Sequence, residues 1–247
     1  PSMVLPERID AVVFDMGGVF IVPDPTVVSE ILRRGGLECE IPTELAADAH
    51  YAGVRGITEL LASQTVAEND LDIWAHYDRK AFGWVGIVGT DLDRAIEVRA
   101  AARRDGNGLH KVWRYPLEAN IAAFHRISSV RPVAIVSNND GTAVDQCRNL
   151  GICQLEADGP LPHVPAIVDS TTIGIAKPDP AIFDPALEAL GTARDRTLYV
   201  GDTVHADVLG AGRAGLPVVQ LDPLDLHVDH DHWRLSDLDA LARHLGA

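Results

Sequence analysis

The chain has 247 residues, of which 47% are hydrophobic and 23% are charged, and its formal net charge is −15. This composition is typical of a folded globular protein and excludes a disordered chain. The negative charge disfavours nucleic acid and anionic membranes, so we expect neither as a partner. It also opposes an anionic substrate, so an anion site must gather its own positive side chains.

The cysteine pattern and the apolar runs indicate where the protein works. The three cysteines are odd in number and lack metal-ligand spacing, so they are predicted to be reduced thiols. No apolar run approaches the length of a membrane span, and the first residues do not resemble a signal peptide. We therefore expect a cytoplasmic protein.

The first structural signal is a short apolar run, Val12 to Phe14, that ends in Asp15. Its residues predict a strand buried on both faces, and Gly17 and Gly18 allow the backbone to turn closely after it. A carboxylate at the carboxyl end of a buried strand lies where open α/β sheets bind ligands. An ordinary turn capped by aspartate is the alternative interpretation of this stretch alone.

Residues 25–112 have a helical pattern without a convincing strand. Helices are predicted from Thr26 onwards and over 44–50, 58–63, 71–82 and 91–104. We expect this region to be a helical domain inserted into a second domain, which residues 1–24 and 113–247 form.

The remaining chain alternates between strands and helices. Strands are predicted within 132–139 and over 166–169, 197–200 and 218–221, and helices over 117–127, 142–150, 181–190 and 207–214. This alternation predicts βαβ units and an α/β fold with a doubly wound, Rossmann-like parallel sheet.

Polar side chains follow several of the predicted strands. They are Asp15, Ser137, Asn138, Asp202 and Asp207, and Lys177 joins them from a loop. Because the carboxyl ends of parallel strands meet at one edge of a sheet, these groups are expected to converge. Carboxylates suit Mg²⁺, whereas a hydroxyl, backbone amides and an ammonium suit a phosphoryl group. One carboxylate is then free to act as a nucleophile.

These motifs resemble, in order and in spacing, those of the haloacid dehalogenase (HAD) superfamily. They are Asp15-Met16-Gly17-Gly18-Val19, Ser137-Asn138, Lys177-Pro178-Asp179-Pro180 and Gly201-Asp202-Thr203-Val204-His205-Ala206-Asp207. Most members are Mg²⁺-dependent phosphatases, so the resemblance implies a hydrolase acting on a small phosphorylated metabolite. It also implies that residues 25–112 form a helical cap, which closes over the site and selects the leaving group.

The resemblance assigns a role to each motif residue. Asp15 would attack phosphorus and form an aspartyl-phosphate. Ser137 and the backbone of Asn138 would hold the phosphoryl group, and Lys177 would pair with both the phosphate and Asp15. The carboxylates of Asp15, Asp202 and Asp207 and the carbonyl of Gly17 would hold Mg²⁺.

One position departs from the family pattern. The phosphatases usually carry a second aspartate two residues after the nucleophile, as a general acid and base, and this chain has Gly17 there. Loss of a positioned proton donor typically costs ~10²–10⁴-fold in rate. Three consequences are possible. Another acid, such as Asp24 or a cap residue, replaces the missing one; the substrate has a good leaving group; or catalysis is weak.

Gly17 also leaves two other functions open. The 2-haloacid dehalogenases of the superfamily lack the second aspartate too, but they need no metal, and Asp202 with Asp207 would then repel Asp15 without compensation. A phospho-ligand-binding protein with impaired catalysis is the third hypothesis.

Other polar and aromatic groups are predicted to be structural. Residues 222–233, with His227, His230 and His232, are interpreted as a solvated acidic loop in preference to a metal site. Trp74, Trp84 and Trp113 are expected to pack within the insert. We also expect a solvated helix end at Arg103-Arg104, a His205 that faces a loop, and buried Cys147 and Cys153.

Overall fold

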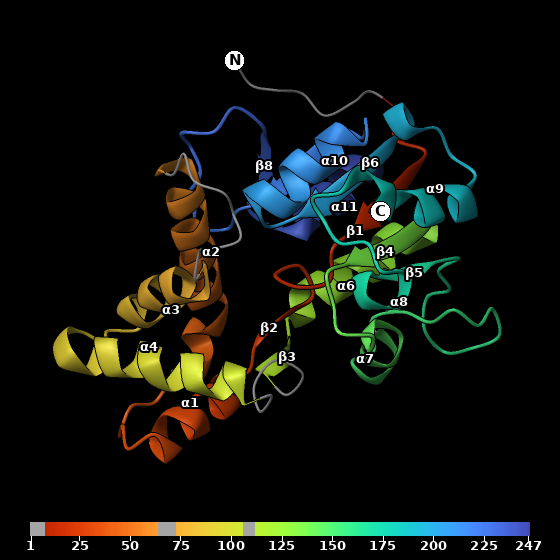
Figure 1. Cartoon of the computed structure of the whole chain (residues 1–247). Coiled ribbons are helices and arrows are strands. Elements are labelled where there is room, and N and C mark those ends of the chain that lie inside the picture. The colour runs from red at the N-terminus through yellow and green to blue at the C-terminus, as the bar shows by residue number, and fades with distance from the viewer. Residues whose placement is uncertain (1–7, 64–72, 106–111) are drawn as a thin grey trace. The chain divides into compact units, whose positions relative to one another are not determined.

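The structure is a computed structural model that describes residues 8–63, 73–105 and 112–247 (Figure 1). The chain divides into two compact units. The first, called the core unit here, comprises Pro1–Phe20 and Pro116–Ala247, and the second, the helical unit, comprises Ile21–Tyr115. The sequence places the insert at 25–112, and the function of that insert as a cap stays a prediction.

The core unit contains a six-stranded sheet in the order β5-β4-β1-β6-β7-β8. The strands are β1 Ala11–Phe14, β4 Val133–Ser137, β5 Ile167–Asp169, β6 Thr197–Gly201, β7 Val218–Leu221 and β8 Trp233–Leu235. Every pair of neighbours is parallel. The predicted doubly wound α/β sheet is therefore confirmed, with β8 added at one edge.

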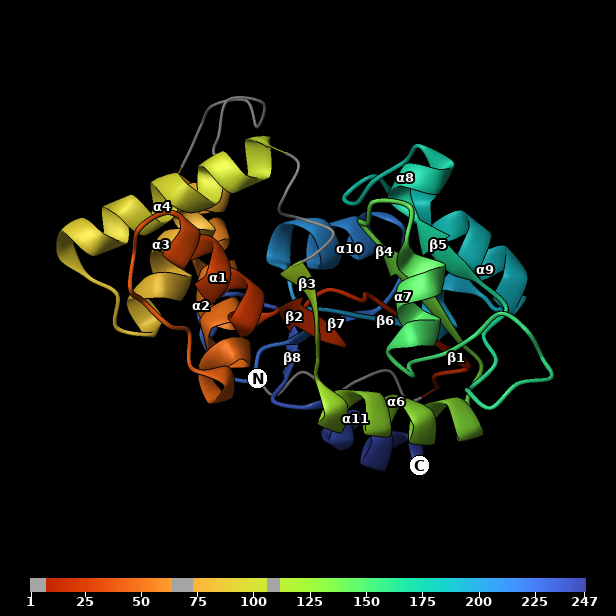
Figure 2. The same ribbon diagram turned by 90° about the horizontal axis from the view of Figure 1, so that it is seen from below.

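Helices cover both faces of this sheet. They are α6 Glu118–Val130, α7 Ala143–Asn149, α8 Ser170–Ile173, α9 Asp184–Leu190, α10 Gly210–Arg213 and α11 Leu238–Leu245, with the 3₁₀ turns η3 Pro180–Phe183 and η4 Arg194–Arg196 and the π-helical turn η5 Val204–Leu209. Figure 2 shows α6 and α11 together on one side of the sheet and α9 and α10 on the other.

Successive residues of β1 supply the two hydrophobic layers, because strand side chains alternate between faces. Val13 packs with Phe183 and Tyr199 in the layer that α9 and α10 cover. Phe14 points the other way, and its ring lies 5.6 Å from that of Phe20 and 5.4 Å from that of Phe124 on α6. The strand that presents Asp15 is thus fixed from both sides.

In its described residues, the helical unit has four longer helices. They are α1 Pro25–Arg34, α2 Ala46–Ser63, α3 Ile73–Trp84 and α4 Gly89–Arg104, with the 3₁₀ turn η1 Thr43–Leu45 and a small sheet of β2 Ile21–Pro23 and β3 Trp113–Pro116. Asp24 caps α1, since its side chain accepts hydrogen bonds from the backbone amides of Thr26 and Val27. Leu32, Phe82 and neighbouring apolar side chains form this unit's own hydrophobic core.

The structure corrects the prediction of separate helices over 44–50 and 58–63. The single helix α2 begins at Ala46, within the first range, and continues through the two glycines between the ranges to the end of the second range. A Cβ atom at Gly53 would lie 2.5 Å from the Tyr77 ring, and one at Gly56 would lie 2.7 Å from the His76 carbonyl. These glycines therefore allow α3 to approach α2 closely and do not end the helix.

Segment 222–233 is a loop, as the sequence suggested, but it is solvated only in part. Asp222 and His227 are buried, and the Asp222 carboxylate accepts hydrogen bonds from the backbone amides of Leu226 and His227. The chain is held here because it returns to the sheet as β8. Among the described residues, the histidines of this segment do not form a cluster with metal-ligand distances.

The expectations on other side chains are met in part. Trp74 and Trp113 pack against the hydrophobic clusters of the helical unit, as expected, but Trp84 is 45% exposed and does not. Arg103 is not a solvated helix end, because it forms a buried ion pair with Asp78. Cys147 and Cys153 are fully buried, as expected.

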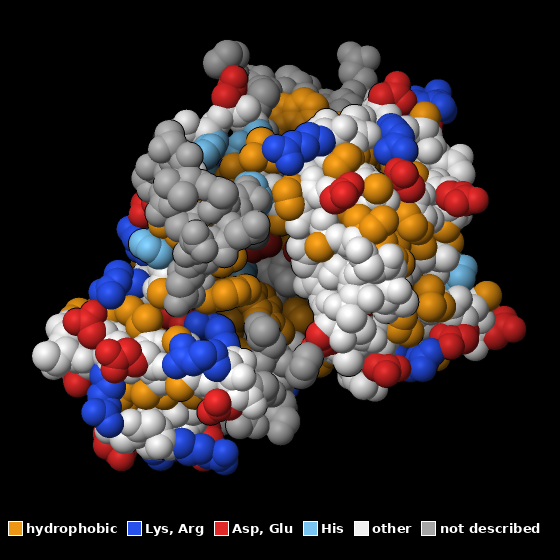
Figure 3. Space-filling view, viewed as in Figure 1, with side chains coloured by type: hydrophobic (Ala, Val, Ile, Leu, Met, Phe, Trp, Pro, Cys, Tyr) orange, Lys and Arg blue, Asp and Glu red, His pale blue; other side chains and the backbone are white. Residues whose placement is uncertain are grey.

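The surface is charged on both units. In the view of Figure 3, acidic and basic side chains alternate on each unit and are not gathered into one patch of a single sign. Within the described residues, no helix combines the length and the apolar character needed to cross a bilayer.

The aromatic cluster behind β1 predicts a large loss of stability on truncation. Phe124→Ala removes the ring that contacts both Phe14 and Phe20, so the free energy of unfolding should fall by ~3–5 kcal/mol in urea titrations. Val130→Ala on the same helix is the control, since Val130 is 37% exposed and should change stability by less than about 1 kcal/mol. Equal losses in the two variants would contradict this role.

Candidate active site

Asp15 is positioned by the end of β1 and by the turn that follows. Its backbone amide donates to the carbonyl of Val200 on β6 at 2.8 Å, which continues the sheet pairing for one more residue. The turn then closes with a bond from the Phe20 amide to the Met16 carbonyl, and Gly18 has φ 68° inside it. Glycine suits that position because other residues rarely adopt a left-handed backbone.

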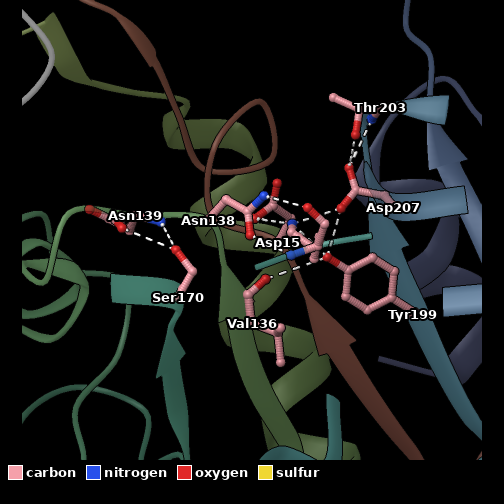
Figure 4. A network of polar contacts seen from close by, with 9 residues as sticks. Asp15, Val136, Asn138, Asn139, Ser170, Tyr199, Thr203 and Asp207 are labelled. Atoms are coloured by element: carbon pink, nitrogen blue, oxygen red, sulfur yellow. Dashed lines mark hydrogen bonds and ion pairs between the residues drawn. The ribbon is translucent and has the colours of Figure 1, made fainter. Parts of the chain in front are cut away.

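The Lys177 ammonium connects the groups that converge on Asp15. Its Nζ lies 2.8 Å from Asp15 Oδ1 and 2.7 Å from Asp207 Oδ1, and it donates to the Tyr199 hydroxyl at 2.9 Å. Figure 4 shows Asp15, Tyr199 and Asp207 turned toward one another from β1, β6 and the turn after β6. All of these side chains are buried.

Asp207 is the most strongly held carboxylate of the group. Its Oδ1 accepts from the Tyr199 hydroxyl at 2.8 Å, and its Oδ2 accepts from the amide and hydroxyl of Thr203 at 2.9 and 2.6 Å (Figure 4). The carboxylate also packs directly over Gly201, where a Cβ atom would lie 2.3 Å from Asp207 Cγ. The glycine before Asp202 therefore leaves the space that Asp207 occupies.

Asp15, Asp202 and Asp207 form an acidic cluster. Each offers a carboxylate oxygen within 4.8 Å of the other two, and all three are buried. In the described part of the chain, one ammonium faces these three carboxylates, and the Oδ1 atom of Asp15 receives no hydrogen bond although it forms the ion pair with Lys177. The excess negative charge and the oxygen donors fit a hard divalent cation such as Mg²⁺.

Burial and charge act against each other on the acids. The pKa of Asp15 is raised to about 7, chiefly by burial and also by the charges of Asp207 and Asp202, while Lys177 acts to lower it. Burial also raises the pKa of Asp207, but Lys177 and the hydrogen bonds from Thr203 outweigh it and hold that pKa below its ordinary value. Asp207 is thus the fixed anion beside Lys177.

The Lys177 ammonium stays charged in this environment. Burial lowers its pKa, but the Asp15 and Asp207 carboxylates outweigh burial and leave the pKa above its ordinary value. Burial raises the pKa of the Tyr199 hydroxyl, and Asp207 adds to the effect, so this group stays neutral and donates its proton to Asp207.

The loop that carries Lys177 is tied to the end of β4. The Asn138 side chain donates to the Lys177 carbonyl at 3.0 Å and accepts from the Lys177 amide at 2.8 Å. Ser137 is the last residue of β4, which pairs with β1, and its side chain is buried. Asn138 therefore fixes Lys177 and Ser137 relative to each other.

Asp169 holds the loop after β4 from the neighbouring strand. Its carboxylate accepts hydrogen bonds from the amides of Gly141 and Ala143 at 3.0 and 3.1 Å. Ser170 Oγ accepts from the Asn139 amide and donates to its carbonyl, both at 3.1 Å (Figure 4). These bonds stiffen the loop that begins with Ser137 and Asn138.

The structure brings together Asp15, Lys177, Asp202 and Asp207, which are the charged residues the sequence singled out. Sequence reasoning missed Tyr199, whose only signal is a polar ring in the otherwise apolar strand β6.

The suggested alternative acid, Asp24, has other partners. One of its oxygens caps α1, and the other accepts from Arg114 Nε at 3.0 Å. Both oxygens therefore already serve the structure of the helical unit.

The chain belongs to the haloacid dehalogenase-like hydrolases, because the model of that family matches residues 9–215. It is 34% identical over 219 residues to a phosphoserine phosphatase of Thermus thermophilus, covering 81% of this chain and 86% of that protein. It is 35% identical over 108 residues to the pyrimidine 5′-nucleotidase YjjG of Escherichia coli, covering 43% of this chain and 45% of that protein.

Solved structures support the fold. A crystal structure of the Bacillus subtilis HAD-hydrolase YfnB bound to magnesium superimposes with a TM-score of 0.58 at 16% identity, covering 98% of this chain and 100% of that one. At this identity the likeness concerns the fold alone. Family, fold and relatives agree on a hydrolase related to phosphatases.

The packing of Asp207 over Gly201 predicts a sharp effect of one methyl group. Gly201→Ala should displace the Asp207 carboxylate and lower the free energy of unfolding by ~1–3 kcal/mol, because the added Cβ would overlap Asp207. Urea titrations measure the change.

Gly212→Ala in α10 is the matched control. A Cβ atom there meets nothing within 4 Å, so stability should stay equal or rise slightly. Equal behaviour of the two alanine variants would contradict the close packing at Gly201.

Proposed function

We propose that the protein is a Mg²⁺-dependent phosphatase of a small phosphorylated metabolite. The observation that carries this proposal is the meeting of three buried carboxylates with one ammonium at the carboxyl ends of parallel strands. A cation site beside a positive side chain suits a phosphate ester, whose charge both would neutralise.

The donors for the cation are the carboxylates of Asp15, Asp202 and Asp207, with the Gly17 carbonyl as a further ligand. The oxygen-only donor set and the excess negative charge support this assignment. When bound, Mg²⁺ supplies neutralisation of the charge that develops on the phosphoryl oxygens.

Asp15 is the proposed nucleophile. Attack of one Asp15 oxygen on phosphorus would form an aspartyl-phosphate and release the alcohol, and water would then break the phosphorus–oxygen bond to Asp15 and release phosphate. Lys177 holds the Asp15 carboxylate in place and keeps its positive charge for the phosphate. The Ser137 hydroxyl and the Asn138 backbone are proposed to hold the remaining phosphoryl oxygens.

The proposed substrate class rests on the Lys177 ammonium and the proposed cation, which suit a phosphate group, and on the names of the related proteins. Phosphoserine and pyrimidine nucleotides, which the names of two relatives state, are small phosphate monoesters. We propose that the helical unit acts as the cap that selects among such compounds, and that the protein functions in the cytoplasm.

The nucleophile and the cation site can be tested together. Asp15→Asn should lower phosphate release by on the order of 10⁴ or more, because the amide is a poor nucleophile. Asp202→Asn should lower the affinity for Mg²⁺, so that a higher Mg²⁺ concentration is needed for half-maximal activity. Release of phosphate from a panel of phosphate monoesters, over a range of Mg²⁺ concentrations, measures both effects.

Asp184→Asn is the matched control for these variants. Asp184 pairs with Arg194 on the surface of the core unit, and its side chain is 56% exposed, so activity should be unchanged. Activity that survives both EDTA and Asp15→Asn would contradict the proposed mechanism.

The absence of a carboxylate at Gly17 predicts a dependence on the leaving group. An aryl phosphate leaves as a stabilised anion, whereas an alkyl phosphate needs a proton. The wild-type enzyme should therefore hydrolyse p-nitrophenyl phosphate much faster than glycerol phosphate. Gly17 does not have a positive φ, so an aspartate can be placed there without a left-handed backbone.

Gly17→Asp should raise kcat for glycerol phosphate by up to ~10²–10⁴-fold and leave kcat for p-nitrophenyl phosphate within a fewfold. Steady-state assays with the two substrates measure the ratio. An unchanged ratio would show that another group already supplies the proton. Gly17→Asn is the isosteric control, because it cannot donate a proton as an acid.

Dehalogenation of 2-halo acids is the second candidate function, and Gly17 is the observation that favours it. Here Asp15 would displace halide from carbon and form an ester, which water would then hydrolyse. Halide release from chloro- and bromo-acids in EDTA would support this function. The acidic cluster favours the phosphatase, since a metal-free mechanism leaves three carboxylates with one ammonium.

A further inference from the structure

The helical unit contains a second group of buried charges, which the proposed phosphatase site does not include. Asp78 of α3 and Arg99 of α4 are 2% and 4% exposed, and the Arg103 side chain, also on α4, is 11% exposed. Among the residues of this unit that the structure describes, two guanidinium groups therefore face one carboxylate. The imbalance has the opposite sign from that at Asp15.

The Asp78 carboxylate is paired with Arg103. Arg103 Nη1 donates to Asp78 Oδ2 at 2.6 Å, and Nη2 donates to Oδ1 at 2.7 Å, a two-pronged geometry in which each carboxylate oxygen receives one bond. The Arg103 guanidinium also lies 5.3 Å from the ring centre of Trp74. Asp78 and Arg103 thus largely neutralise each other.

Arg99 shares the Asp78 carboxylate with Arg103 and is paired with it only at long range. Its Nε lies 4.0 Å from Asp78 Oδ1, which is too far for a hydrogen bond, and its Nη1 is buried without a hydrogen-bond partner in the part of the chain that the structure describes. Burial lowers the pKa of Arg99, yet an arginine does not lose its proton in proteins. A buried charge of this kind calls for a counter-ion.

A small cavity lies beside Arg99. Its volume is about 30 Å³, and its lining joins Arg99 and Asp78 to His50, Tyr77 and apolar side chains such as Phe82. A water molecule needs roughly 10–15 Å³ of such space, so the cavity has room for about two waters or for one small ion of similar size. A neutral water would satisfy a hydrogen bond but would leave the charge of Arg99 compensated only by the Asp78 carboxylate that it shares with Arg103.

We propose that this cavity binds a small monovalent anion, held by the guanidinium of Arg99. The size restricts the ligand to a halide ion or to the carboxylate of a very small acid such as formate. The apolar lining favours a single negative charge over a multiply charged phosphate, since burying further charge needs further partners. The site lies wholly within the helical unit and is separate from the acidic cluster.

Thermal unfolding of the full chain tests the proposal. The salts are NaCl, NaBr, sodium formate and sodium gluconate at one ionic strength, gluconate being too large for the cavity. At a hundredfold excess over the dissociation constant, a bound anion should raise Tm by about 5–10 °C relative to gluconate. A rise with chloride and bromide alone identifies a halide site, and a rise with formate identifies a carboxylate site.

Arg99→Met should abolish the difference among the salts, because it keeps an apolar stem but removes the charge. Arg79→Met is the matched control, since Arg79 lies in the same unit, is paired with Asp93, and has a side chain that is 53% exposed. This control should keep the full dependence. Salt effects that are equal in wild type and Arg99→Met, or a Tm that is the same in all four salts, would overturn the proposal.

Crystals of the wild-type protein grown in NaBr provide a second test, which needs no substituted protein. An anomalous peak of bromide within hydrogen-bond distance of Arg99 Nη1 is the expected result. Density for water alone in this cavity, without an anomalous signal, would overturn the assignment. Neither test measures turnover, so both outcomes are independent of the proposed phosphatase activity.

Discussion

The ion pair between the Lys177 ammonium and the carboxylates of Asp15 and Asp207 is the contact on which the rest of the core unit depends. The parallel sheet brings the ends of β1 and β6 together, and Asn138 fixes the backbone of Lys177 from the end of β4. The Tyr199 hydroxyl donates a hydrogen bond to Asp207 and accepts one from Lys177, so it bridges these two residues. Each element contributes one fixed group to a single charged centre.

The same rule of charge balance applies to each of the two units by itself. Among the described residues, buried carboxylates outnumber the ammonium at the site of the core unit, and buried guanidinium groups outnumber the carboxylate of Asp78 in the helical unit. Burying an unpaired charge is costly, so each imbalance indicates an ion of the opposite sign. A cation beside Asp15 and an anion beside Arg99 are two consequences of the same physical rule.

The sequence was sufficient to predict the sheet and the charged residues of the site, because apolar runs that end in polar residues mark buried parallel strands. It was insufficient where a contact between distant segments decides the outcome. The pattern predicts two helices over 44–50 and 58–63, but the lack of a side chain at Gly53 admits Tyr77 within one continuous helix. Arg103 resembled a solvated helix end because the pairing with Asp78 arises only when α3 and α4 pack.

The central claim is that the acidic cluster of the core unit binds one divalent cation. Isothermal titration calorimetry of the full chain with Mg²⁺, without substrate, tests it most directly. We predict one Mg²⁺ per chain for the wild type and for Asp184→Asn, and binding weakened at least about tenfold in Asp202→Asn, which loses a charged ligand. Absent binding in the wild type, or equal binding in Asp202→Asn, would contradict the account.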